Sequence, residues 1–206
     1  MPYRSPISRR SLFALGGAGA AAAWVAPRSA VAACARISFR HPLLEKAKAA
    51  LDAHQDLIVE RDRIGIADFA RSSRELRFTI ADLHSGIARS YRVAHGRGSD
   101  PDHSGWLQAF SNVPDSLATS RGAYLTGEEY DGKHGRSRRL TGLDATNNEA
   151  ADRAIVIHGA WYANDDMIDK WGKLGRSEGC FAFAEAQLSE VVELLGPGRL
   201  LFADKV

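Results

Sequence analysis

The sequence predicts a mainly β (α+β) domain with an N-terminal helix and peripheral helices. Three observations predict it. Apolar and polar residues alternate in several short segments, as in half-buried strands, and two longer segments carry apolar residues at helical steps of three and four. Clusters of glycine, serine, asparagine and aspartate separate these segments, as turns do. The chain has 206 residues, which is enough for one domain with a sizeable core but too few to expect two full domains.

Residues 1–32 have the order of an export signal. The pair Arg9-Arg10 precedes an apolar stretch of 14 residues, 12–25, and the small-residue triplet Ala30-Val31-Ala32 follows it. The arginine pair is typical of the twin-arginine route. The apolar stretch is shorter than the roughly 20 residues of a membrane-spanning helix. We therefore expect an exported protein, periplasmic or envelope-associated, without a transmembrane segment in the mature chain.

Removal of the export signal would change the net charge of the chain. Removing the four arginines of residues 1–32 from the 27 basic residues leaves 23 against 25 acidic ones, a net charge of about −2. A mature chain with this balance has no basic footprint for nucleic acid. The sequence therefore argues against a nucleic-acid partner.

The chain has two cysteines, Cys34 and Cys180. Cys34 lies two residues after the predicted cleavage site, in a predicted linker over residues 33–42. It could stay free or be trimmed, it could carry a lipid anchor because small residues precede it, or it could pair with Cys180 in the oxidising envelope. That disulfide would silence Cys180 as a nucleophile.

A single domain is expected over residues 43–206. Its first element is a helix at about 43–58, opened by Pro42, and a strand hairpin over 76–93 turns at 84–86. Short strands and long loops are expected over 94–152. A β-branched apolar run at 154–157 predicts a buried strand that ends at His158. A second helix over 184–195 stops at Gly196-Pro197-Gly198, and a last strand follows at 200–202.

The stretch Ser177-Glu178-Gly179-Cys180 carries the clearest chemical pattern. A cysteine between a glycine turn and an apolar run can present its sulfur at the edge of an element. Neighbouring backbone N–H groups can then form an oxyanion hole for an acyl intermediate. A thiol also needs a partner base, since its ordinary pKa is about 8.5. His158, at the end of a buried strand, is the candidate.

The order of these motifs resembles a known family. Ile157-His158-Gly159, followed by Ser177-Glu178-Gly179-Cys180, is similar to the His-Gly … Ser-His-Gly-Cys signature of L,D-transpeptidases, the YkuD-like murein enzymes. The chain is most similar to their divergent branch, the murein L,D-transpeptidase catalytic domain family proteins, over roughly residues 60–204. Further matching stretches lie at 93–99, 110–112, 120–124, 135–143 and 153–160. The resemblance implies an L,D-transpeptidase-like β-sandwich or barrel.

The resemblance also implies a reaction. Cys180 would attack the carbonyl between the diamino acid and the D-Ala of a peptidoglycan stem peptide. D-Ala would leave, and an amine of another stem peptide, or water, would take the acyl group. His158 would activate the thiol, Ser177 would organise the turn, and the N–H groups of Gly179 and Cys180 would hold the oxyanion. No metal or organic cofactor is implied.

Three further residues are candidates for substrate binding by the same resemblance: Gly159, Arg176 and Tyr124. The chain departs from the family pattern in the spacing of 22 residues from His158 to Cys180, which leaves room for an insert over 161–173. It also departs at Glu178, where the signature has a second histidine. Phe181-Ala182 stands where many members have an apolar residue and an arginine, and Arg176 could replace that arginine.

Other interpretations stay open. A zinc site of a D-Ala metallopeptidase would draw on His95, Asp100, His103 and His158, although they lack a closely spaced ligand signature. The basic cluster Arg136, Arg138 and Arg139 could contact substrate carboxylates. The same cysteine site could act hydrolytically, as an L,D-carboxypeptidase or amidase. A non-catalytic module that binds peptidoglycan is the remaining alternative, and the sequence predicts no oligomeric state.

Overall fold

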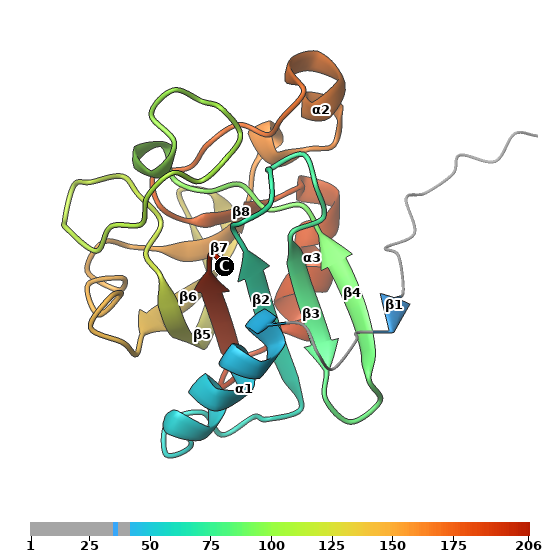
Figure 1. The fold of residues 1–206 in the computed structure, drawn as a ribbon, viewed down its shortest axis with the longest axis vertical. Coiled ribbons are helices and arrows are strands. Elements are labelled where there is room, and N and C mark those ends of the chain that lie inside the picture. Colours follow the sequence, from blue (N-terminus) through green and yellow to red (C-terminus); the bar gives the residue numbers. More distant parts are fainter. Residues whose placement is uncertain (1–34, 37–41) are drawn as a thin grey trace, which may run out of the picture. The chain divides into compact units, whose positions relative to one another are not determined.

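The computed structural model describes residues 35–36 and 42–206, with side chains from residue 43 (Figure 1). The predicted export signal, Cys34 and most of the linker at 33–42 lie outside the described residues. Among the described residues, no helix combines the length and the apolar character that crossing a membrane requires.

The described chain forms one sheet of nine strands with short helices around it. The strands are β1 (Ala35–Arg36), β2 (Arg63–Asp68), β3 (Phe78–Asp82), β4 (Ile87–Tyr91), β5 (Gly122–Gly132), β6 (Gly135–Gly142), β7 (Val156–Gly159), β8 (Phe181–Phe183) and β9 (Leu200–Asp204). The helices are α1 (Pro42–Ala53), α2 (Asp166–Trp171) and α3 (Glu185–Leu194), with 3-10 turns η1 (Arg97–Ser99) and η2 (Trp161–Ala163). The mainly β architecture with peripheral helices is confirmed.

The sheet has the strand order β1-β4-β3-β2-β9-β5-β6-β7-β8. Its neighbours are antiparallel except for two parallel pairs, β2 with β9 and β7 with β8. The far end of the sheet returns to the segment after β4, where the Ala94 N–H donates to the Ala182 carbonyl at 2.8 Å. This bridge nearly closes the sheet.

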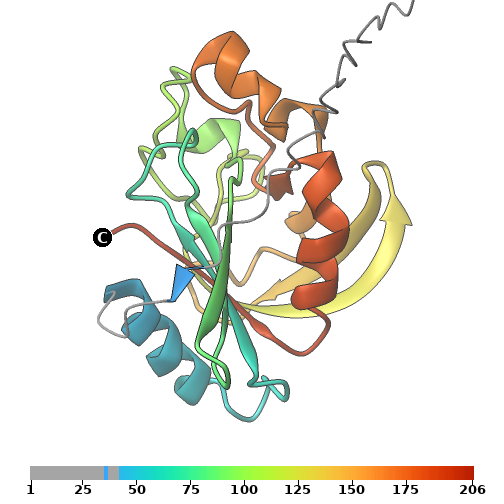
Figure 2. The same ribbon diagram turned by 90° about the vertical axis from the view of Figure 1, so that its right-hand side faces the viewer.

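A helix covers each face of the sheet (Figure 2). On one face, α1 buries Leu43, Leu44, Ala47 and Leu51 against alternate residues of β2 and β9. On the other face, α3 buries Leu188, Val191, Val192 and Leu195 against strands that include β3, β7 and β8. The central strands are apolar on both sides because both faces are covered.

Most of the predicted elements occur close to where the sequence placed them. Helix α1 ends at Ala53, and hydrogen-bonded turns continue the chain to Ile58. The expected hairpin is β3–β4, the strand before His158 is β7, and α3 and β9 follow as predicted.

The expectation of only short strands over 94–152 is wrong. Strands β5 and β6 form a long hairpin that curls beside α3 (Figure 2). The outer half of β5 is exposed and rich in glycine and charge, so it lacks the alternation by which strands are recognised. Backbone pairing, interrupted by a bulge between Thr126 and Glu129, holds it instead.

Tyr124, a candidate for substrate binding from the sequence, lies in the core and not among the residues that line the cavity described below. Its side chain on β5 is fully buried and packs edge-on against Phe181, with ring centroids 5.4 Å apart. Its hydroxyl donates to the Ser120 carbonyl at 2.7 Å. Burial raises the pKa of this hydroxyl. Tyr124 therefore belongs to the core and anchors the loop before β5.

We expect Tyr124→Phe to lower the free energy of unfolding by about 1–2 kcal/mol, because the buried Ser120 carbonyl loses its donor. Urea unfolding followed by circular dichroism measures this change. Tyr130→Phe is the matched control, since that ring is only half-buried and lies over Arg139. Equal effects of the two substitutions would contradict the assignment.

Candidate active site

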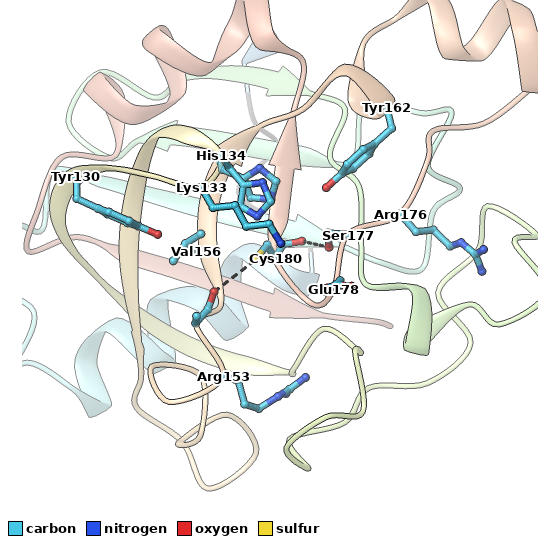
Figure 3. A pocket seen from close by; sticks show the side chains of 12 residues that line it. Tyr130, Lys133, His134, Arg153, Val156, Tyr162, Arg176, Ser177, Glu178 and Cys180 are labelled. Atoms are coloured by element: carbon cyan, nitrogen blue, oxygen red, sulfur yellow. Dashed lines mark hydrogen bonds between the residues drawn. The ribbon is translucent and has the colours of Figure 1, made fainter.

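Both predicted catalytic residues, Cys180 and His158, line one cavity of about 500 Å³. Figure 3 shows the side chains around this cavity, with Cys180 near the centre. Its other walls come from the tip of the β5–β6 hairpin, the segment before β7, and the connection between β7 and β8. The cavity therefore collects residues that are distant in the chain.

The parallel pairing of β7 with β8 places Cys180 beside the strand that carries His158. Cys180 immediately precedes β8, in which Phe181 is opposite Ile157 and Ala182 is opposite His158. The thiol is free and buried, and it donates to the Ala154 carbonyl at 3.5 Å. The sulfur thus sits at the edge of an element, facing the cavity.

The thiol of Cys180 is protonated at rest. Burial raises its pKa above the ordinary value, and the negative charge of Glu178 adds to this. The Val156 N–H and the Arg153 guanidinium act in the opposite direction, because both favour the thiolate. A base is therefore needed to take the proton when the sulfur reacts.

His158 is held as a neutral base. Burial lowers its pKa to about 4, although the Gly159 carbonyl favours the charged form. Nδ1 lies 2.9 Å from that carbonyl, which can only accept, so Nδ1 carries the proton and Nε2 has the free lone pair. The ring stacks on His134, with centroids 4.2 Å apart and an interplanar angle of 20°.

Ser177 and Gly179 shape the turn that presents Cys180. The Ser177 hydroxyl donates to the Cys180 carbonyl at 2.7 Å and accepts from the Gly179 N–H at 3.2 Å. Gly179 has a φ of +121°, and a β-carbon there would lie 2.9 Å from the Ala118 carbonyl oxygen. Only glycine fits this position. Because the Gly179 N–H bonds within the turn, it is not a free oxyanion donor in this state.

The turn is braced from behind by residues 95–97. The Ser177 N–H donates to the His95 carbonyl at 2.9 Å, and the Arg97 N–H donates to the Ser177 carbonyl at 2.8 Å. His95 is fixed in turn by Arg77, whose buried guanidinium lies 2.6 Å from His95 Nδ1. The turn that presents Cys180 therefore rests on a buried polar network.

This network argues against the zinc interpretation. Burial and the Arg77 charge lower the pKa of His95 to about 3, and a guanidinium beside the ring opposes a metal cation. His95 Nε2 lies 3.4 Å from Asp100, while His103 Nε2 bonds the Leu174 carbonyl. No group of three metal-ligating side chains occurs within residues 43–206, the part with described side chains.

The remaining residues that the sequence suggested for substrate contacts form hydrogen bonds within the protein. Arg176 does line the cavity, and its guanidinium bonds the carbonyls of Asp100 and Pro101. Gly159 contributes its carbonyl to His158 rather than a wall of the cavity. Arg136 and Arg138 bond Glu129 and other groups of the hairpin and α3.

Arg153 and His134 are among the cavity residues that were missed from the sequence. Arg153 makes four hydrogen bonds to the loop before β5, with Ser111, Ser116, Ala118 and Ser120. A serine-rich loop and an arginine before a buried strand are the only sequence signals for this contact. His134 had no signal, because only the folded hairpin brings its tip to His158.

We expect Arg153→Met to slow alkylation of Cys180 by iodoacetamide at pH 8, because a charge that favours the thiolate is lost. It should also lower the free energy of unfolding by about 2–3 kcal/mol through the lost hydrogen bonds. Arg153→Lys keeps the charge but cannot reach four acceptors, so it should restore the alkylation rate more than the stability. Unchanged alkylation in Arg153→Met would contradict the electrostatic role.

Comparison with known proteins gives the family. The family model for the L,D-transpeptidase catalytic domain matches residues 37–203. No curated protein matches the chain. Solved structures with a similar fold include an L,D-transpeptidase from Mycobacterium smegmatis, at 12% identity and a TM-score of 0.43, covering 69% of this chain and 58% of that one.

Two further similar structures come from other bacteria. One is the L,D-transpeptidase of Xylanimonas cellulosilytica, at 15% identity, with a TM-score of 0.42 and coverage of 77% and 69%. The other is the helical cell shape determining protein Pgp2 of Campylobacter jejuni, at 14% identity, with a TM-score of 0.46 and coverage of 77% and 54%. The chain spans 58% to 60% of the first three matched chains. From the family match over residues 37–203, the chain belongs to the L,D-transpeptidase catalytic domain family.

Proposed function

We propose that the protein is an exported, peptidoglycan-modifying L,D-transpeptidase that works through an acyl-cysteine. The observation that carries the proposal is the shared cavity, which is lined by both a free Cys180 thiol and a neutral His158 with an available Nε2. Membership of the family supports the substrate class. The export signal predicted at residues 1–32 supports the location, since peptidoglycan lies outside the cytoplasmic membrane.

In the proposed first step, His158 Nε2 takes the proton of the Cys180 thiol. The sulfur attacks the carbonyl carbon between the diamino acid and D-Ala, and the carbonyl electrons move to oxygen. The Cys180 N–H is the proposed oxyanion donor, because the Gly179 N–H already bonds Ser177. The oxyanion collapses, the C–N bond breaks, and His158 returns its proton to the leaving amine.

In the proposed second step, an acceptor resolves the thioester. An amine of a second stem peptide, deprotonated by His158, would attack the same carbonyl and release the thiol, giving a cross-link. Water in that position would give an L,D-carboxypeptidase or amidase.

Incubation with a carbapenem should give an acyl adduct on the intact protein, measured by mass spectrometry. Cys180→Ser should form no stable adduct, and His158→Gln should slow acylation by about 100-fold or more, because the general base is lost. His54→Gln is the matched control for histidine removal, since it lies outside the cavity and contacts Asp144. An adduct that persists in Cys180→Ser, or fast acylation without His158, would overturn the proposal.

To separate transfer from hydrolysis, muropeptides should be digested with and without an added D-amino acid. Exchange into the fourth position, or cross-linked dimers, supports a transferase. Free tripeptide as the sole product would assign the same site to hydrolysis.

The acylation rate should fall only at an unusually low pH. Only neutral His158 can accept the thiol proton, and its pKa is lowered to about 4, so activity should hold from pH 7 to 5 and fall as the pH drops through about 4. Stopped-flow acylation rates measure this, with circular dichroism at each pH confirming a folded protein. His134→Asn should move this pH upward, because the charge of His134 lowers the pKa of His158. A midpoint of 6 to 7 in the wild type would contradict the buried neutral base.

A further inference from the structure

A second feature lies beside the cavity, on the connection between β7 and β8. Four aromatic rings form a continuous group there: Trp161 and Tyr162 of η2, Trp171 of α2, and His103 of the loop after η1. Trp161 contacts Tyr162 at 5.8 Å and Trp171 at 6.1 Å between ring centroids, and Trp171 contacts His103 at 6.2 Å. We call this group the aromatic ledge.

The ledge is exposed although its rings are large and apolar. Trp161 is 59% exposed and Trp171 is 46% exposed. Exposed apolar surface of this kind marks an interaction site when it is contiguous, whereas single exposed residues need no explanation. The mature chain has one other tryptophan, Trp106, so two of its three tryptophans lie on the ledge.

The ledge is held firmly in place. Ala163, Met167 and Leu174 pack beneath it in a small buried cluster with Ala94 and Ala182. The Gly175 N–H donates to the Tyr162 carbonyl at 2.7 Å, which closes the connection on itself. A rigid aromatic surface loses little conformational entropy when it binds a ligand.

Tyr162 joins the ledge to the cavity. Its ring contacts Trp161 on one side, and its hydroxyl points into the cavity that holds Cys180 (Figure 3). A ligand lying on the ledge is therefore next to whatever occupies the cavity. The occupant of the ledge should be covalently linked to the substrate or bound beside it.

The size of the ledge limits the kind of ligand. Its two tryptophans together expose about the area of one whole tryptophan side chain, roughly 150–250 Å². A stable protein partner needs about 800 Å² on each side, so the ledge is too small for one. A membrane surface would favour basic residues around the rings, but α2 carries Asp166 and Asp169 against Lys170.

A saccharide fits both the size and the chemistry. One face of a pyranose ring consists of C–H groups, which carry a slight positive charge and are attracted to the negative face of an indole. The planes of Trp161 and Trp171 meet at 72° in an edge-to-face contact, so the two rings offer faces in two orientations rather than one flat plate. Faces in two orientations can contact successive units of a sugar chain, whereas a single flat ligand can lie on only one of them.

We propose that the aromatic ledge binds the glycan strand of peptidoglycan, a chain of N-acetylated amino sugars, while its stem peptide enters the cavity. This inference rests on the proposed function for its choice of saccharide. Two sites for one polymer increase the effective concentration of the stem peptide at Cys180. The enzyme would then prefer glycan-linked peptides over free ones.

The test uses glycan strands freed of their stem peptides, so that no acyl transfer can occur. Indole N–H signals of the ¹⁵N-labelled protein should shift saturably for Trp161 and Trp171. Trp161→Ala and Trp171→Ala should each weaken binding by about tenfold, whereas Trp161→Phe should retain part of it. Ile87→Ala is the matched control, because Ile87 is 49% exposed on β4 and should leave binding unchanged.

The outcomes distinguish this inference from the proposed function. Carbapenem acylation of the same samples reports on Cys180 alone. Glycan binding without acylation would therefore support the glycan site on the ledge and contradict the proposed enzymatic function. No binding of glycan strands, or equal binding by all variants, would overturn the ledge. Two further results would give the ledge another occupant if glycan strands do not bind. Self-association in sedimentation that is lost in Trp161→Ala would assign the surface to a second copy of the chain. Binding to anionic vesicles that is lost in the same variant would assign it to a membrane.

Discussion

Strands β7 and β8 run in the same direction, and His158 and Cys180 share a cavity because of it. A parallel pair cannot be joined by a tight turn, so the chain must leave the end of β7 and return to the start of β8 by a crossover. That crossover contains η2 and α2, and it ends in the turn at Ser177. The long spacing between base and nucleophile, the aromatic ledge and the wall of the cavity are therefore consequences of one pairing.

The same pairing buries the side chains of Cys180 and His158, and burial decides their charge. An ion pair of thiolate and imidazolium would need solvation that this wall does not provide. Burial instead raises the pKa of Cys180 and lowers that of His158, so both are neutral at rest. In the proposed mechanism, Cys180 becomes a thiolate only as its proton moves to His158. The fixed bond from His158 to the Gly159 carbonyl matters because it leaves the correct nitrogen free.

Those elements of the fold and the site that depend on a local sequence pattern could be predicted from the sequence. The strand before His158 and helix α3 follow from apolar patterns, and the Gly179 turn follows from the need for a positive φ. The hairpin β5–β6 was missed because backbone pairing, not side-chain alternation, holds its outer half. The burial of Tyr124 was not foreseen, because nothing local distinguishes a core tyrosine from one that faces a cavity. His134 and Arg153 act across long loops, which one sequence does not reveal.

Phe181-Ala182 stands where many family members have an apolar residue and an arginine, and the structure gives a reason for this difference. Phe181 and Ala182 are fully buried, one against Tyr124 and the other beneath the bridge from Ala94. An arginine at 182 would have to be buried in an apolar cluster, at a large desolvation cost. A positive charge at position 182 is therefore unfavourable in this fold. Arg153 brings a positive charge toward Cys180 from the segment before β7, and its hydrogen bonds to the loop before β5 fix it there.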